Sequence, residues 1–116
     1  MKFKNIDLKY LNEISDGKKD LMMEMIQIFN SEVPGYIRSM YQYYESGNWE
    51  ALGKLSHKAK ASASIMGMKQ LASDLKDLEL LTQEQKDTRL YPHLLKSIEN
   101  QFLAAMEELK SFKQTL

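Results

Sequence analysis

Cysteine is absent from this 116-residue chain, and its charges cancel, with 16 basic and 16 acidic residues. The lack of cysteine excludes disulfides, thiolate catalysis and zinc–thiolate sites. The zero net charge lacks the positive excess that is typical of nucleic-acid-binding proteins. No apolar run approaches the ~20 residues that cross a bilayer, and the charged N-terminal sequence is unlike a secretory signal. We therefore expect a cytoplasmic protein with no nucleic-acid or membrane partner.

The residues that are present have the composition of an ordinary globular domain. Hydrophobic residues make up 43% of the chain and charged residues 28%, so extensive disorder is not expected. The length suits one compact core, and we assign residues 1–116 to a single domain. Met1 and the helical end of the chain favour a free-standing protein.

Apolar residues recur at three- and four-residue spacing, and no segment alternates with a period of two. The pattern predicts helices at 7–14, 18–45 and 49–66, a fourth helix carrying the apolar stripe at 71–81, and a last one that follows Pro92. Such helices, joined by short polar breaks, predict an all-α protein: an antiparallel up-down four-helix bundle with an additional short N-terminal helix.

Two segments leave room for other interpretations. Pro34 and Gly35 look like a turn, but the apolar positions keep their helical phase across them, so we expect one helix that is kinked at Pro34. The polar segment "TQEQKD", residues 82–87, is expected to be a loop or a frayed turn. The eight methionines have helical spacing and are expected to fill the core. Of the tyrosines at position 36 and in "YQYYE", residues 41–45, some are expected to pack inside and others are candidates for a docking patch beside His57.

His57 occupies the third predicted helix, opposite the apolar stripe of that helix, and is therefore expected to face solvent. Most surface histidines have no special role. A metal site would need further ligands, and an oriented general base would need a carboxylate; neither lies within one helical turn of His57. His93 is not paired with it by anything in the sequence and is expected to be an ordinary surface residue. His57 could still act as a nucleophile towards an anionic group brought by a partner.

The surroundings of His57 suit that chemistry. Small side chains on the same helix would let another protein approach closely, and Lys60, one turn on, could offset the charge of a group attached to the ring. We expect the partner to contact the neighbouring lysines and small residues, namely Gly53, Lys54, Lys58, Ala61 and Ser64.

Three sequence features together resemble the histidine-containing phosphotransfer (HPt) domain of bacterial phosphorelays. They are "HKAKAS" at residues 57–62, Gly67, and "LASDLKDLE" at residues 71–79. The resemblance implies that His57 accepts a phosphoryl group, that Lys60 accompanies it, and that Gly67 allows close helix packing. The chain departs from the family at Ala61, where glycine is common, and at Ala59, where a larger apolar residue is common; neither change touches the nucleophile.

The resemblance also implies the partners. They are response-regulator receiver domains and a hybrid sensor histidine kinase, with the receiver bringing Mg²⁺ and this chain, as a monomer, binding no metal or cofactor. No glycine-rich nucleotide-binding loop is present, so an autonomous kinase is not expected. The alternative function is that of a non-catalytic helical-bundle adaptor that binds receiver or kinase domains.

Overall fold

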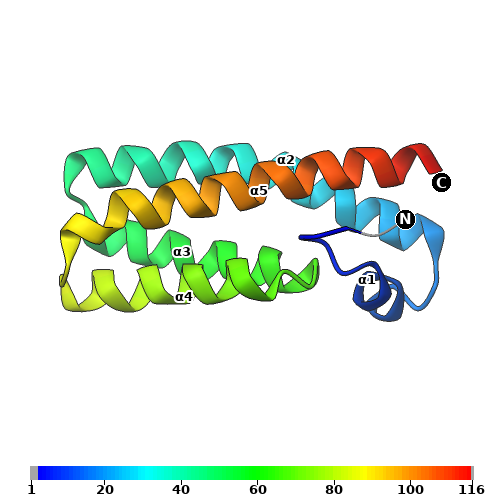
Figure 1. Ribbon diagram of the computed structural model, residues 1–116, viewed down its shortest axis with the longest axis horizontal. Coiled ribbons are helices and arrows are strands. Elements are labelled where there is room, and N and C mark those ends of the chain that lie inside the picture. Colours follow the sequence, from blue (N-terminus) through cyan, green and yellow to red (C-terminus); the bar gives the residue numbers. More distant parts are fainter. Residues whose placement is uncertain (1–2, 116) are drawn as a thin grey trace.

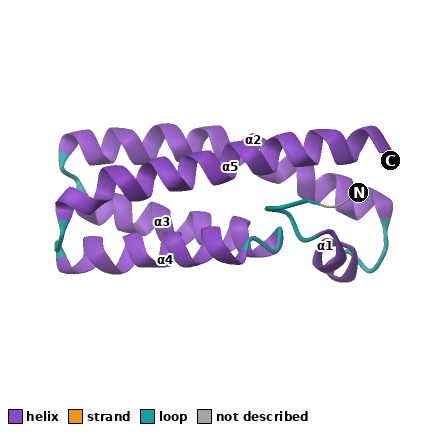
Figure 2. Ribbon diagram, viewed as in Figure 1, coloured by secondary structure: helices purple, strands orange, loops and turns teal. Residues whose placement is uncertain are grey.

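The structure, a computed structural model, describes residues 3–115, and this part of the chain contains helices and no strand. The elements are α1 (Leu8–Ile14), α2 (Lys19–Ser46), α3 (Trp49–Ile65), α4 (Lys69–Glu84), a short 3₁₀ helix η1 (Thr88–Leu90) and α5 (Tyr91–Thr115). Helices α2 to α5 run alternately up and down, and α1 lies at the end of the bundle where α2 begins and α5 ends (Figure 1, Figure 2). The predicted bundle with an additional N-terminal helix is confirmed. Met1 lies outside the described residues.

Helix α2 is continuous through Pro34, as the unbroken apolar phase predicted. Pro34 is exposed, whereas Val33 before it and Tyr36 after it are buried on the core side. Because proline has no N–H, the carbonyl of Asn30 loses its helical partner, which lets the helix bend at this point. In Figure 1 the first half of α2 slopes towards α1, while the second half runs along the bundle.

The core is formed by one apolar stripe from each long helix. Leu71, Leu75 and Leu78 of α4 are fully buried, as their spacing predicted. The prediction that the methionines fill the core is confirmed for four of them: Met22, Met40, Met66 and Met68 are buried. Met23, Met25 and Met106 are only partly buried. The long axis of the resulting bundle is 43 Å, against 21 and 20 Å across.

The predicted loop at residues 82–87 is wrong in its first half. Thr82 to Glu84 complete α4, which ends where Gln85 takes a left-handed conformation with φ 54°. Thr82 is buried, and its hydroxyl donates to the carbonyl of Leu78, 2.8 Å away, so the polar atom has a partner within its own helix. The last helix begins at Tyr91, so that Pro92 lies in its first turn, where a missing N–H costs nothing.

The tyrosines of α2 are engaged within the bundle. Tyr36 is buried, and its hydroxyl donates to Glu32. The Tyr41 hydroxyl donates to Glu99 of α5, and burial together with this carboxylate raises the pKa of Tyr41 to about 12. Tyr44 packs against Trp49, with ring centroids 6.0 Å apart.

Gly67 allows a close approach at the end of α3, but the approaching segment is the start of α1 and not another long helix. Its φ of +69° is in the left-handed region, and an added Cβ would lie 2.5 Å from the Cβ of Asp7. The backbone N–H of Asp7 donates to the carbonyl of Met66 over 3.1 Å. The close packing implied for Gly67 is therefore present, with α1 as the partner.

A second contact fixes the N-terminal segment to α5. The carboxylate of Glu108 accepts hydrogen bonds from the backbone N–H groups of Asn5 and Ile6, at 3.1 and 3.0 Å. Hydrogen bonds to a charged acceptor are stronger than neutral ones, so Glu108 holds this end of the chain against the bundle.

Replacing Gly67 by alanine should destabilise the protein more than the same change at Gly47. Both glycines have a φ of +69°, but nothing lies within 4 Å of a Cβ at Gly47. Gly47→Ala should cost about 1–2 kcal/mol of backbone strain, and Gly67→Ala about 2 kcal/mol more because Asp7 must move. Urea denaturation of both variants measures the two losses; equal losses would show that the approach of Asp7 places no demand on residue 67.

Candidate functional site

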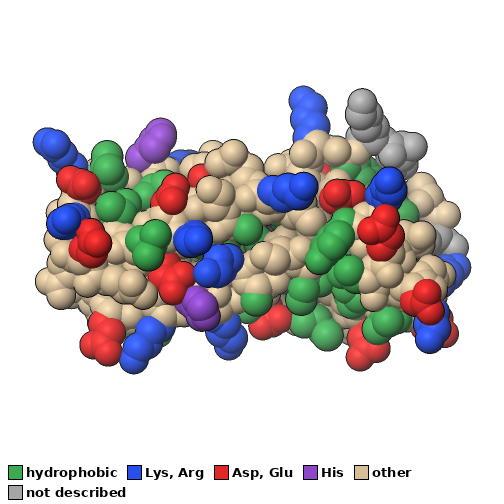
Figure 3. Space-filling model, turned by 90° about the horizontal axis from the view of Figure 1, so that it is seen from below, with side chains coloured by type: hydrophobic (Ala, Val, Ile, Leu, Met, Phe, Trp, Pro, Cys, Tyr) green, Lys and Arg blue, Asp and Glu red, His purple; other side chains and the backbone are tan. Residues whose placement is uncertain are grey.

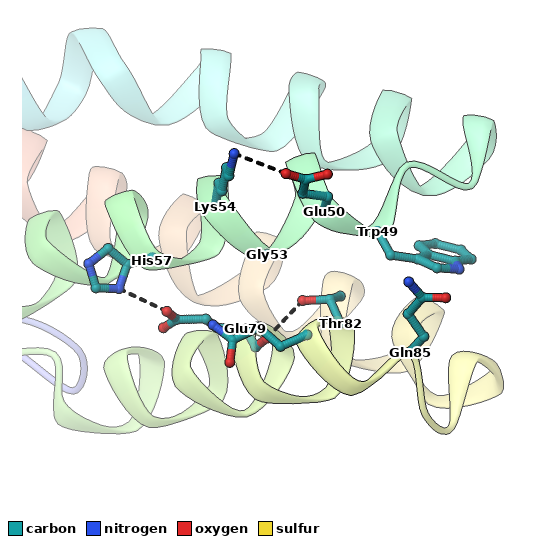
Figure 4. Close-up of a pocket in the computed structure, with 9 residues that line it drawn as sticks. Trp49, Glu50, Gly53, Lys54, His57, Glu79, Thr82 and Gln85 are labelled. Carbon is teal, nitrogen blue, oxygen red and sulfur yellow. Dashed lines mark hydrogen bonds and ion pairs between the residues drawn. The ribbon is translucent and has the colours of Figure 1, made fainter.

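His57 projects from α3 beside α4, and among the described residues only its Nδ1 has a hydrogen-bond partner. Its side chain is 66% exposed, which confirms the prediction that it faces solvent, and its Nδ1 lies 2.9 Å from Oε2 of Glu79 (Figure 4). A carboxylate only accepts hydrogen bonds, so Nδ1 carries the proton. In the neutral imidazole the lone pair is then on Nε2.

Lys60 binds the other oxygen of the same carboxylate. Its Nζ lies 3.3 Å from Oε1 of Glu79, and the lysine side chain is 29% exposed. Glu79 itself is 14% exposed, so it is a largely desolvated acceptor whose two oxygens face one imidazole and one ammonium. Glu79 of α4 thus bridges His57 and Lys60, which lie one turn apart on α3.

The expectation that no carboxylate orients His57 is wrong. It rested on neighbours within one helical turn of α3, whereas Glu79 belongs to α4. A signal was available in the sequence: α3 and α4 form a hairpin around Gly67, and His57 lies ten residues before this glycine while Glu79 lies twelve after it. In an antiparallel hairpin, residues at similar distances from the turn lie opposite each other.

A groove of about 620 Å³ extends from His57 along the contact between α3 and α4 to Trp49 and Gln85. Gly53 was expected to form part of an exposed contact surface, but it is buried at the base of this groove. Its Cα faces Thr82 of α4. No tyrosine lines this groove.

The remaining predicted contact residues are exposed on α3, and Lys54 among them also borders the groove. Lys54 is 77% exposed and pairs with Glu50 at 3.1 Å, pointing away from His57 in Figure 4. Lys58, Ala61 and Ser64 are exposed, and Ser64 borders a second hollow that is shared with Tyr10 of α1.

The face seen in Figure 3 has a mixed character. Lysine, carboxylate and histidine side chains are interspersed over one part of it, and hydrophobic side chains gather towards the end where α1 lies. His93, the other histidine, is exposed in the first turn of α5. Within residues 3–115 no group of three or more His, Cys, Asp or Glu side chains could hold a metal ion. No helix in the described chain is long and apolar enough to span a membrane.

Comparisons with known proteins identify the family of the chain. The family model of the Hpt domain matches residues 24–112, a span that includes His57, Lys60, Gly67 and Glu79. The chain belongs to the Hpt domain family. As an Hpt domain, it carries out histidine phosphotransfer in a phosphorelay, where such domains interact with receiver domains and kinases.

The bundle is also similar to a solved structure. The crystal structure of histidine-containing phosphotransfer protein B (HptB) from Pseudomonas aeruginosa PAO1 superposes with a TM-score of 0.85, over 97% of this chain and 96% of that chain, at 23% identity. No curated protein sequence gives a significant match. The structural similarity to HptB includes α1, which lies before the residues matched by the family model.

The hydrogen bond to Glu79 should set the tautomer of His57. In Glu79→Ala the acceptor is lost, so the fraction of neutral imidazole with its proton on Nδ1 should fall. In Glu79→Gln the amide oxygen can still accept from Nδ1, so that fraction should be largely kept. Two-dimensional ¹⁵N NMR of the imidazole measures it directly, and an unchanged tautomer in Glu79→Ala would show that the contact does not orient the ring.

Proposed function

We propose that Nε2 of His57 accepts the phosphoryl group from a receiver domain and later passes it to another receiver. One observation carries the proposal: His57 is exposed, yet its Nδ1 is held by Glu79. The ring therefore presents a fixed nitrogen with a free lone pair to an approaching protein. Phosphoryl transfer demands mainly positioning and charge stabilisation, and this arrangement supplies the first.

The step is a displacement at phosphorus. The Nε2 lone pair forms the N–P bond, the bond between phosphorus and the receiver's aspartate oxygen breaks, and the aspartate leaves as a carboxylate. The proton on Nδ1 stays, so the phosphorylated ring carries a positive charge beside the negative carboxylate of Glu79. The reverse step, with a second receiver's aspartate as the attacking group, returns the lone pair to Nε2.

Lys60 has a place in the same scheme. Lys60 lies one helical turn after His57, and Glu79 holds its ammonium near the ring. The ammonium can therefore offset the charge of the phosphoryl group. Mg²⁺ is proposed to come with the receiver domain. A hybrid sensor kinase is the proposed source of phosphate for the first receiver, and this chain is proposed to be no autonomous kinase. The cytoplasmic location and the monomeric state stay predictions.

Labelling tests the nucleophile. Incubated with a phosphorylated receiver and Mg²⁺, the protein should gain one acid-labile, base-stable phosphoryl group, as expected for a phosphoramidate. His57→Gln should abolish labelling with little change in the melting temperature, because the side chain is mostly exposed. Mass spectrometry measures the number of phosphoryl groups, and the stability of the label in acid and base identifies the linkage.

Two controls accompany this experiment. His93→Gln should label as the wild type does, and ATP without a receiver should give no label. Labelling of His57→Gln, or an unlabelled wild type across the receivers of its own cell, would remove the carrier function and leave the adaptor as the function of the chain.

Removing the charge of Lys60 should weaken the site. Lys60→Ala should lower transfer or shorten the lifetime of the phosphohistidine by roughly fivefold, which corresponds to about 1 kcal/mol for a partly exposed charge. Lys76→Ala is the control, because Lys76 is an exposed lysine of α4 and is not among the predicted contact residues. Equal lifetimes in both variants would show that the position of Lys60 next to Glu79 has no part in transfer.

A further inference from the structure

Gly53 lies one helical turn before His57 on α3, in a helix interior where glycine is unfavourable. It is fully packed: a Cβ added here would lie 2.5 Å from Oγ1 of Thr82, 3.5 Å from its Cβ and 3.7 Å from the carbonyl oxygen of Glu79. The nearest of these distances is shorter than real Cβ atoms tolerate. The contact between α3 and α4 therefore needs a residue without a side chain at position 53.

Thr82 cannot easily move out of the way. Its side chain is buried, and its single O–H is shared between the carbonyl oxygens of Leu78 and Glu79, each 2.8 Å from Oγ1. Figure 4 draws the side chains of Thr82 and Glu79 beside Gly53. As a β-branched residue in a helix, Thr82 also has few rotamers. The hydroxyl that faces Gly53 is thus fixed to the backbone of the very residue whose carboxylate holds His57.

The two contacts are consecutive along the hairpin. Gly53 and His57 are four residues apart on α3, and Thr82 and Glu79 are three apart on α4, so both pairs lie on the facing sides of the two helices. Helices move as stiff bodies over one turn. A separation of ~1 Å at the first contact would carry Glu79 beyond the ~3.2 Å limit of a good hydrogen bond to Nδ1.

We propose that Gly53 and Thr82 are positioning residues for phosphotransfer: their close contact sets the distance between α3 and α4 at which Glu79 reaches Nδ1 of His57. This inference rests on the proposed role of His57. The groove beside the histidine takes its base from the same contact. Neither residue touches the phosphoryl group, so both act through Glu79.

Gly53→Ala should reproduce the loss of Glu79. We expect the Nδ1-protonated fraction of His57 to fall, and the transfer rate at saturating receiver to drop roughly tenfold, since small displacements of reacting groups are costly. The receiver concentration at half-maximal rate should change little, because the outer side of α3 is untouched. Gly35→Ala is the matched control: an added Cβ there meets nothing within 4 Å, so tautomer and rate should stay as in the wild type.

Substitutions at Thr82 separate positioning from general loss of structure. In a Thr82→Ala background the clashing Oγ1 is gone and the remaining Cβ contact of 3.5 Å is ordinary, so adding Gly53→Ala should change neither tautomer nor rate. In a Thr82→Ser background Oγ1 is kept, and adding Gly53→Ala should remain harmful. Thermal unfolding of each variant checks that it is folded at the temperature at which the tautomer and the transfer rate are measured.

The outcomes distinguish this inference from the function on which it rests. A wild-type tautomer and rate in Gly53→Ala would overturn the inference, and so would an equal loss in the Thr82→Ala background. If His57→Gln is unlabelled in the same assay, the proposed nucleophile still stands. An unlabelled wild type would overturn the nucleophile, and the NMR measurement would still decide whether Gly53 positions Glu79.

Discussion

The carboxylate of Glu79 is largely removed from water, and it is stabilised there only because two donors of α3 meet it. A desolvated charge without any partner would be expensive, so the imidazole of His57 and the ammonium of Lys60 together stabilise Glu79, and Glu79 in turn holds both of them. The cluster needs α3 and α4 at one particular separation. Much of the remaining structure serves to set that separation, from the leucine stripe of α4 to the glycine at the base of the groove.

The hairpin also explains how an exposed side chain can be well ordered. The backbone of His57 belongs to a helix whose opposite face is buried by Leu52, Ala59 and Ala63. Its ring is then held at one nitrogen by a carboxylate from the neighbouring helix. As the proposed nucleophile, His57 would stay accessible to a protein partner without sampling many orientations, which would reduce the entropy lost on forming the reactive complex.

Much of the fold could be predicted because its signals are local. The spacing of apolar residues in α2 keeps one phase through Pro34, and Asn48 and Gly47 are typical boundary residues for helices. The end of α4 was missed because Thr82 is polar in sequence yet buried in the structure, where its own helix satisfies its hydroxyl. A polar residue of this kind looks the same in a sequence as one in a loop.

The site was harder to predict, for a physical reason. Periodicity places a side chain around the axis of its own helix, which was enough to show that His57 is exposed and lies near Lys60. It does not tell which neighbouring helix faces that side, so Glu79 was given no role and Gly53 was assigned to the outer surface. Both become visible only when α3 and α4 are paired across Gly67.

The way α5 holds the N-terminal segment has a consequence for the order of the helices. Glu108 accepts from Asn5 and Ile6, and the rings of Phe3 and Phe112 meet edge to face at 6.4 Å, so the two ends of the described chain lie side by side. A short linker could join them, and new ends could be opened between Gln85 and Asp87 without cutting the α3–α4 hairpin. Such a circular permutant would start with α5 and end with α4, yet it would keep His57 and Glu79 on one unbroken hairpin. The connectivity of the bundle is therefore separable from the geometry of its site.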